Sequence, residues 1–316
     1  MDKVCLKNLF SEEYEHELDK STLDKLHKTP GLEMVTKKFV EMGLEKGLFL
    51  EFTSSCIKCS ENTFPNEINI LHNACNILGL IETPEMYILD DPYIGARTFG
   101  VKRPIIILNS GSLDKLNDNE LLFLLGHEIG HIKSKHILYH QLDMFFPMLA
   151  SALGNVTFGL SKIPTMAIQV AVSRWSRASD LTSDRAGLLA CQDINTSIDV
   201  FMKISGIPNK YYGKIQRRDF IEQLKDFNDF DFGTIDKMIL LMTASFGNSV
   251  NIVNQYSLTR SAFLLKWHKN GEYQNLLERH KHQEQIRVIS TVKCNNCGVV
   301  LDKEDIFCAS CGMKVN

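Results

Sequence analysis

The segment His-Glu-Ile-Gly-His at residues 127–131 is the feature that most constrains how this chain can fold. Residues four positions apart lie on one face of an α-helix, so a helical segment lets the imidazoles of His127 and His131 reach the same metal ion. Glu128 then lies beside them, where a carboxylate can hold an attacking water and accept its proton. The spacing predicts a helix with two zinc ligands and a general base. The alternative is a helix whose histidines serve only packing.

Residues 117–139 have the pattern of such a helix. Asn117 can cap its start, and Glu120 is placed to complete a capping box. Leucines recur on one side of the segment, as expected for a buried face. We expect the helix to run to about residue 139. His136 and His140 would then lie on its last turns and away from the metal, with a ligand role as the alternative.

The rest of the chain is organised as helices around a short stretch of strands. Residues 1–60 are amphipathic and helical in pattern, with a break at 29–31, and residues 67–78 resemble another helix. Short β-branched runs between turn residues predict two or three strands within 85–108. Helical patterns return over 174–290. The sequence therefore predicts an α+β fold that is mostly α-helical.

The composition excludes several classes of protein. With 44% apolar and 23% charged residues, this chain of 316 residues is neither disordered nor a polytopic membrane protein. Its 35 basic and 38 acidic residues give a net charge of −3, so no overall basic field favours nucleic acid. The first residues contain no continuous apolar run, so we expect no secretory signal and predict a cytoplasmic location.

One nearly uncharged segment, residues 144–173, leaves three interpretations open. Its length approaches the roughly 20 residues that span a bilayer, but Pro147, Gly154 and Asn155 dilute its apolar character. We predict a buried helical hairpin. A hairpin that contacts a membrane from one side and a transmembrane span are the alternatives.

The C-terminal residues contain four of the nine cysteines of the chain, arranged as two CxxC pairs: Cys294, Cys297, Cys308 and Cys311. Four thiolates in this spacing predict a closed structural zinc site, and a glycine after each pair accepts a positive φ. So short a module cannot bury enough apolar surface to fold alone, so zinc should supply its folding energy. Its balanced charges favour a protein partner over nucleic acid. A third pair, Cys56 and Cys59, lacks a matching pair, so free thiols are expected rather than a shared site.

Two segments together resemble peptidase family M48. Residues 120–136, ELLFLLGHEIGHIKSKH, and 173–191, SRWSRASDLTSDRAGLLAC, are similar to its HExxH motif and its downstream SRxxExxADxxG helix. The resemblance implies that Asp180 is the third zinc ligand and that Asp184 orients a ligand histidine from behind. Arg177 and Gly187 occupy matching positions.

Asp180 stands where the family has glutamate. An aspartate also binds zinc but is one methylene shorter, so the two helices must approach more closely or the metal must move. The alternative is that Asp180 and Asp184 form an exposed acidic face.

The resemblance extends over about residues 60–280. Residues 84–116 are similar to the strands before the family's catalytic helix, although the family's asparagine is absent from the segment Ala96 to Phe99. An edge strand there could bind substrate backbone by β-augmentation. Arg260 and Trp267 match a later block, HPxxxxRxxxLxxW, in which Asn254 replaces the histidine. The resemblance implies that Arg260 or Asn254 stabilises the oxyanion.

These patterns predict a zinc-dependent metalloendopeptidase with one catalytic and one structural Zn2+. Its substrates would be proteins or peptides bound in extended conformation. We predict a zincin-like domain at 61–285 with a small mixed sheet beside the HExxH helix, an N-terminal helical region at 1–60 packed on it, and a zinc ribbon at 292–316 that could contact a protein partner. Peripheral membrane contact through 144–173 is retained. The alternative is a catalytically weakened relative that acts as a zinc-stabilised binding module, because Asp180 and Asn254 depart from the family pattern.

Overall fold

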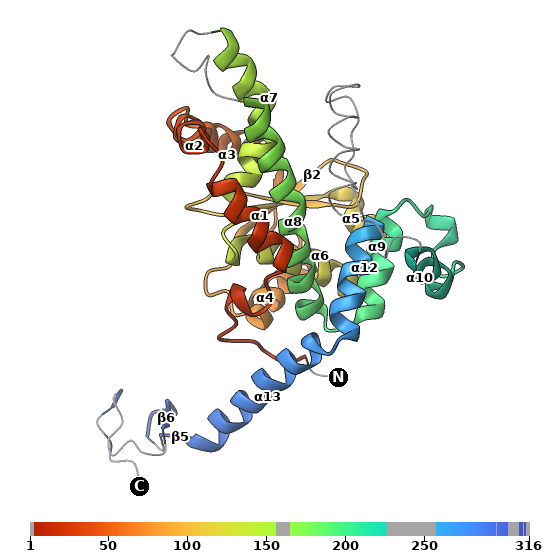
Figure 1. Ribbon diagram of the computed structural model, residues 1–316. Helices are drawn as coiled ribbons and strands as arrows, with labels where there is room; N and C mark the ends of the chain where they lie inside the picture. The colour runs from red at the N-terminus through yellow and green to blue at the C-terminus, as the bar shows by residue number, and fades with distance from the viewer. Residues whose placement is uncertain are drawn as a thin grey trace.

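The computed structural model describes residues 3–155, 165–225, 257–294, 296–302, 310–311 and 313. This part of the chain is mostly helical with a small mixed sheet, as predicted (Figure 1). The helices are α1 (Glu17–His27), α2 (Leu32–Glu41), α3 (Leu44–Ser55), α4 (Pro65–Leu78), α5 (Ser110–Lys115), α6 (Asp118–Lys133), α7 (Ile137–Asn155), α8 (Thr165–Cys191), α9 (Ile194–Ile204), α10 (Arg217–Lys225), α12 (Ser257–Lys269) and α13 (Glu272–Ser290), with short 3-10 turns at Ser11–Glu13 and Asn209–Tyr211. The strands are β1 (Ile57–Lys58), β2 (Glu85–Leu89), β3 (Ala96–Phe99), β4 (Ile105–Asn109), β5 (Thr291–Lys293) and β6 (Val300–Asp302).

Four strands form one mixed sheet in the order β1-β2-β4-β3. β2 and β4 are parallel, whereas β3 is antiparallel to β4, with Ala96 opposite Leu108. Every residue of β4 is buried because a central strand is covered on both faces. β3 is an edge strand and contacts α6. Residues 85–108 thus contain three strands, within the two or three expected, and β1 adds a fourth in a stretch expected to be helical.

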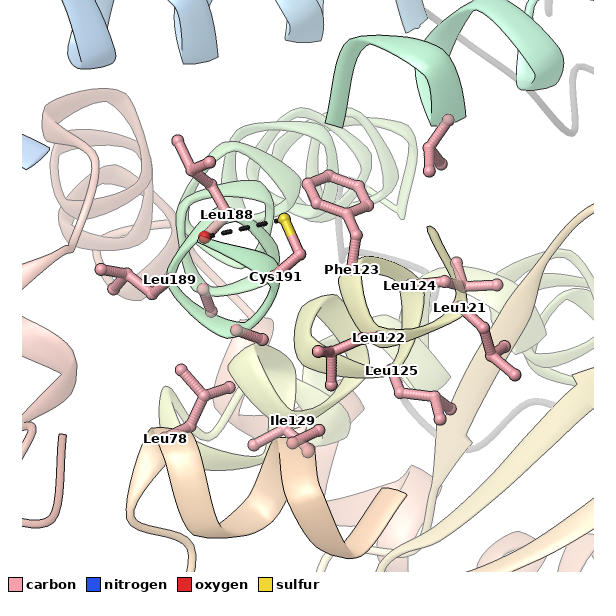
Figure 2. Packing of buried hydrophobic residues seen from close by; sticks show 14 of the residues in the cluster. Leu78, Leu121, Leu122, Phe123, Leu124, Leu125, Ile129, Leu188, Leu189 and Cys191 are labelled. Carbon is pink, nitrogen blue, oxygen red and sulfur yellow. Dashed lines mark hydrogen bonds between the residues drawn. The ribbon is translucent and has the colours of Figure 1, made fainter. Parts of the chain in front are cut away.

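Helices α6 and α8 pack against each other through small residues. A Cβ atom at Gly130 would lie 2.8 Å from the Cβ of Ala186, and one at Gly126 would collide with Ala190. Larger apolar residues surround this close contact, including Phe123 on α6 and Leu188 on α8 (Figure 2). Each fully buried leucine contributes about 1.5–3 kcal/mol to folding. The main core therefore fixes the separation of these two helices.

The helix that carries the HExxH segment ends at Lys133, well before the predicted end near residue 139. Lys135 has a φ of 58°, a left-handed conformation through which an α-helix cannot continue, and α7 begins two residues later. The expectation that His136 and His140 lie on the last turns of this helix is wrong. This reversal brings both imidazoles back against His131, with ring centroids 5.3 Å and 4.5 Å from the His131 ring, respectively.

Residues 144–173 lie in α7 and α8, apart from 156–164, which are outside the described residues. The two helices contact each other, and Phe146 and Leu149 of α7 are buried. Met144 and Met148 are each 43% exposed. Within the described ranges, no helix is long and apolar enough to cross a bilayer. Membrane contact through this segment stays a prediction.

The C-terminal module lies at the far end of α13, which projects from the helical body (Figure 1). There β5 and β6 form a two-stranded antiparallel sheet. The third CxxC pair flanks β1 instead. Cys59 is buried in the main core and Cys56 is partly buried, and neither belongs to a cluster of metal-binding groups among the described residues.

Candidate metal centre

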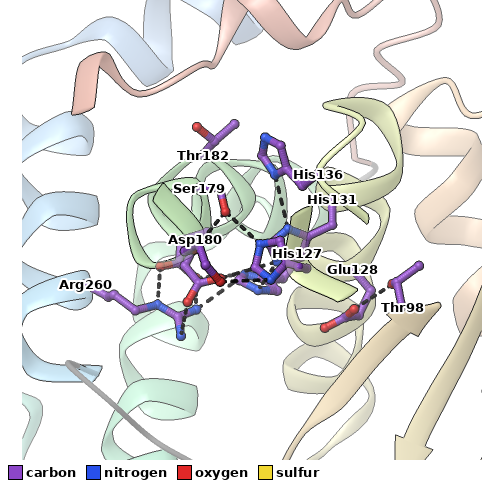
Figure 3. Close-up of polar contacts among 12 residues, drawn as sticks. Thr98, His127, Glu128, His131, His136, Ser179, Asp180, Thr182 and Arg260 are labelled. Atoms are coloured by element: carbon purple, nitrogen blue, oxygen red, sulfur yellow. Dashed lines mark hydrogen bonds and ion pairs between the residues drawn. The ribbon is translucent and has the colours of Figure 1, made fainter. Parts of the chain in front are cut away.

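α6 points two imidazole nitrogens at the same spot. Asn117 and Glu120 form the predicted capping box at the start of this helix. One turn apart, His127 and His131 are both buried, and their Nε2 atoms are 3.0 Å apart (Figure 3). A tetrahedral zinc with Zn–N bonds of 2.0–2.1 Å needs a separation of about 3.3 Å between the two nitrogens. The spacing of this pair fits that requirement.

Asp180, on α8, adds a third metal-binding side chain to the two histidines of α6. Its Oδ1 lies 3.5 Å from His131 Nε2, and the three ligand atoms of His127, His131 and Asp180 all lie within 4.8 Å of one another. The glycine contact between α6 and α8 allows this short side chain to reach the histidines. Burial alone would raise the pKa of Asp180, but Arg260 and His131 together lower it below its usual range. Asp180 is therefore a carboxylate at neutral pH.

Asp184 lies behind the first ligand. Its Oδ1 is 2.9 Å from His127 Nδ1 and is buried. A carboxylate can only accept, so Nδ1 carries the proton of His127 and Nε2 presents a lone pair. That lone pair faces His131 Nε2 and Asp180 within a buried site. Three such electron-rich atoms together fit a cation, so the residues present suit the zinc ion that the sequence pattern predicts.

Arg260, on α12, holds both acidic residues. Its Nε donates to Asp184 Oδ2 at 2.7 Å and its Nη2 donates to Oδ1, while Nη1 lies 3.7 Å from Asp180. Burial would lower the pKa of Arg260, but the two carboxylates raise it above its ordinary value. This guanidinium is thus a fixed positive charge at the back of the site, and most of its donors are already engaged.

Glu128 lies beside the donor group, next to the edge strand. Thr98 of β3 donates a 2.6 Å hydrogen bond to Glu128 Oε2 (Figure 3). Burial raises the pKa of Glu128, against the lowering effects of His127 and Thr98, and makes it a stronger base. The sequence pattern gave no reason to single out Thr98, because only three-dimensional pairing brings β3 to the motif.

A cavity of about 260 Å³ opens over these groups. β3 forms one side of it, and His127, Glu128, His131, Asp180 and Arg260 all line it. A larger cavity of about 490 Å³ lies near α9 and α10, but its lining contains no histidine or cysteine. Of these two cavities among the described residues, the smaller one is lined by the histidines and the aspartate that could hold a metal.

His140 also lines this cavity, although both of its nitrogens face serines. Its Nε2 is 2.7 Å from Ser179 Oγ and its Nδ1 is 3.3 Å from Ser176 Oγ. Burial lowers the pKa of His140 to about 4. Burial and the neighbouring His140 also hold the pKa of His131 well below its ordinary value, so both rings are neutral near pH 7.

The ribbon cysteines gather separately from this centre. Cys294, Cys297 and Cys311 form a second metal-binding group, in which two sulfurs, those of Cys294 and Cys311, are 3.6 Å apart. A tetrahedral zinc with Zn–S bonds near 2.3 Å needs about 3.8 Å. Gly298 has the expected positive φ, 72°. A hydrogen bond from the backbone of Met313 and another from the side chain of Asn296 lower the pKa of Cys311 to about 6, which favours the thiolate.

Two of the predicted site residues, Asn254 and Cys308, lie outside the described residues. The structure brings together every other predicted residue of each site. Two residues escaped the sequence analysis, Thr98 and Asp19, which lies behind His136. His136 and His140 were considered there but were placed on the last turns of the HExxH helix.

Comparison with known proteins identifies the two parts of the chain. The family model described as "Peptidase family M48" matches residues 67–280, and a zinc-ribbon domain model matches 290–315. The chain is 25% identical over 288 residues to "Plastoglobule-localized metallopeptidase 48, chloroplastic" of Arabidopsis thaliana, an alignment that covers 90% of this chain and 81% of that protein.

Shorter matches relate this chain to proteins named "Protease HtpX homolog". The protein from Tropheryma whipplei is 32% identical over 148 residues, which cover 38% of this chain and 50% of the relative. The protein from Dictyoglomus turgidum is 36% identical over 94 residues, covering 29% of this chain and 31% of the relative. The resemblance noted in the sequence is confirmed: the chain belongs to peptidase family M48 and carries a zinc ribbon at its C-terminal end.

Proposed function

We propose that this M48 metallopeptidase is a zinc-dependent endopeptidase in which His127, His131 and Asp180 hold the catalytic zinc. The observation that carries the proposal is the convergence of these donors with Glu128 on one cavity beside an edge strand. A bound zinc supplies Lewis acidity to the scissile carbonyl and to the attacking water. Protein or peptide substrates follow from the family.

Glu128 is the general base in this proposal. It lies outside the donor group and faces the cavity, so its carboxylate can accept a proton from water beside the metal position. The hydrogen bond from Thr98 leaves Oε1 for that proton and fixes the orientation of the carboxylate. The edge strand therefore supports the base directly.

β3 is the proposed platform for the substrate backbone. It is the outer strand on one side of the sheet, and its residues line the cavity next to Glu128. An extended peptide could pair with this strand as an added strand, which would place a backbone carbonyl beside the catalytic groups. Such pairing recognises backbone rather than sequence and suits substrates that are locally unfolded.

Arg260 is assigned to hold Asp184 and Asp180 in place, in addition to the predicted oxyanion role. Its Nε and Nη2 bind Asp184, so Nη1 is the nitrogen left to act on a substrate oxygen.

We further propose a structural zinc in the ribbon. A cytoplasmic location with peripheral membrane contact through 144–173 is retained, where Met144 and Met148 are exposed on α7.

Replacement of Glu128 tests the mechanism. Glu128→Gln should lower kcat for an unfolded protein substrate by about 100- to 10,000-fold, because an amide cannot accept the proton. Bound zinc should stay within about twofold of the parent, since Glu128 is not a ligand. Glu33→Gln, an exposed change on α2, is the control and should retain full activity. Parent-like turnover by Glu128→Gln would contradict the assignment of the base, whereas absence of turnover in the parent itself would favour the binding-module alternative.

A further inference from the structure

A second imidazole lies directly behind the ligand His131. His136 Nδ1 is 3.1 Å from His131 Nδ1 (Figure 3). His136 Nε2 is 3.1 Å from Asp19 Oδ2. His136 and Asp19 are buried, with 3% and 1% of their surface exposed. The three side chains therefore form a line that starts at the proposed metal ligand and ends on helix α1.

Only one placement of protons satisfies every link of this line when His131 binds a metal. A metal takes the lone pair of His131 Nε2, so Nδ1 carries the proton and donates to His136 Nδ1. His136 must then accept at Nδ1 and carry its own proton on Nε2. That N–H faces the carboxylate of Asp19, which can only accept. Each group thereby has the partner that its neighbour requires.

Asp19 is itself fixed by the helix that supplies the third ligand. Thr182 of α8 donates a 2.6 Å hydrogen bond to Asp19 Oδ2, and the backbone N–H of His16 donates to the Thr182 hydroxyl at 3.0 Å. Helices α1 and α8 also make an extensive contact. The Asp19 carboxylate is thus hydrogen-bonded to α8, the helix that carries Asp180, and these contacts fix its position.

A competing assignment makes His136 a metal ligand, because ligand atoms of His131, His136 and His140 lie within 4.8 Å of one another. The hydrogen bonds argue against it. Both nitrogens of His140 face serine hydroxyls, and His136 Nε2 faces Asp19. A metal between His131 and His136 would also compete with the zinc for the His131 ring.

We propose that His136 and Asp19 are positioning residues that fix the tautomer and the ring orientation of His131. The inference rests on the proposed zinc site. His127 has its own support in Asp184, so each ligand histidine is oriented by a separate carboxylate, one directly and one through an imidazole. Asp19 lies outside the region that matches the family model, so helix α1 becomes part of the metal centre.

The test compares zinc affinity across variants of the full chain. His136→Phe keeps a ring and removes both hydrogen bonds, whereas His136→Gln restores an acceptor toward His131 and a donor toward Asp19. We expect zinc affinity at the catalytic site to fall by about 10- to 100-fold in His136→Phe and Asp19→Ala. His136→Gln should lie much closer to the parent. Thr22→Ala, another buried truncation on α1, should match the parent because its hydroxyl bonds only to backbone carbonyls.

Two measurements distinguish a changed orientation of the His131 ring from a general loss of structure. Affinity is measured by chelator competition on variants whose thermal unfolding midpoints are recorded without metal. The absorption spectrum of the Co2+ form reports ligand geometry and should change in His136→Phe but not in Thr22→Ala. If His136→Phe does not fold, the isosteric Asp19→Asn replaces it, with a loss of affinity again expected.

Three distinguishable results would contradict the positioning role of His136 and Asp19 or the zinc site on which it rests. Parent-like zinc affinity and Co2+ spectra in both Asp19→Ala and His136→Phe would refute the positioning role and leave the proposed zinc site untouched. An additional metal bound by the parent and lost in His136→Phe would make His136 a ligand instead. His131→Ala is measured in parallel, and unchanged zinc content in that variant would refute the proposed zinc site itself.

Discussion

The two groups of side chains that we propose to bind zinc are built in opposite ways. In the M48 part, His127 and His131 are buried and come from a helix in the main core. Asp184 contacts His127 from behind, and His136, which itself contacts Asp19, lies behind His131. In the ribbon, Cys297 and Cys311 are exposed, and the module lies at the end of a projecting helix. The first group is positioned by the fold around it, whereas the second belongs to a short module at the end of α13.

Because of this difference, we expect a metal to serve catalysis in the M48 part and folding in the ribbon. Where a core already positions the donors, metal binding adds chemistry and only modest stability. Where the chain is too short to bury a core, the binding free energy of the metal is the folding free energy. We therefore expect the two parts to respond differently to the same treatment.

Removal of metal should give the largest contrast. A strong chelator should abolish peptidase activity and unfold the ribbon, while the M48 part keeps its cooperative thermal transition, since its core does not depend on zinc. Hydrogen exchange would show loss of protection confined to β5 and β6. Loss of the main thermal transition would mean that the catalytic group is also held together by its metal.

Single ligand replacements should separate the two groups. His131→Ala should lower the zinc content by about one ion and activity by at least about 100-fold, because it removes a ligand that the fold cannot replace. Cys297→Ser should also lose about one zinc, yet keep the turnover of a small peptide. Metal analysis and peptide hydrolysis check both. A parent-like zinc content in Cys297→Ser would contradict the proposed structural site.

A change in the helix contact should have an intermediate effect. Gly130→Ala introduces a methyl group 2.8 Å from Ala186 and should cost about 1–3 kcal/mol of stability. A shift of α8 by about 1 Å would also move Asp180 and could lower kcat by about 100-fold. Gly47→Ala on α3 is the control, because nothing lies within 4 Å of the added atom. Thermal unfolding and kinetics of the two variants would show whether core packing sets the ligand geometry.

The smallest effect is expected at the edge strand. Thr98→Val keeps the shape of the side chain and removes the hydrogen bond to Glu128, which should lower kcat by about tenfold. Zinc content and stability should match the parent. Thr98→Ser, which keeps the hydroxyl, should restore most of the activity, and equal rates in the two variants would exclude a role for this bond.

The sequence predicted the donors of both groups better than their supports. His127 and His131 follow from helical periodicity, the cysteines from their spacing, and Asp180 from a family pattern. The sequence analysis placed His136 on the HExxH helix because the turn at Lys135 contains no glycine or proline that would predict a helix end. Asp19 could not be found, because its role depends on α1 packing against α8, a contact between residues far apart in the chain. Local patterns encode ligands, whereas tertiary contacts select their partners.

The supports of the catalytic group have a consequence for how the protein matures. One comes from Asp19 near the start of the chain and another from Arg260, after the ligands. Contacts between such distant residues form late in folding, because a long loop must close first. A chain still emerging from the ribosome would carry Asp19 and the HExxH helix before Arg260 has been synthesised. The proposed catalytic group would then be complete only after Arg260 has been synthesised and has reached Asp184.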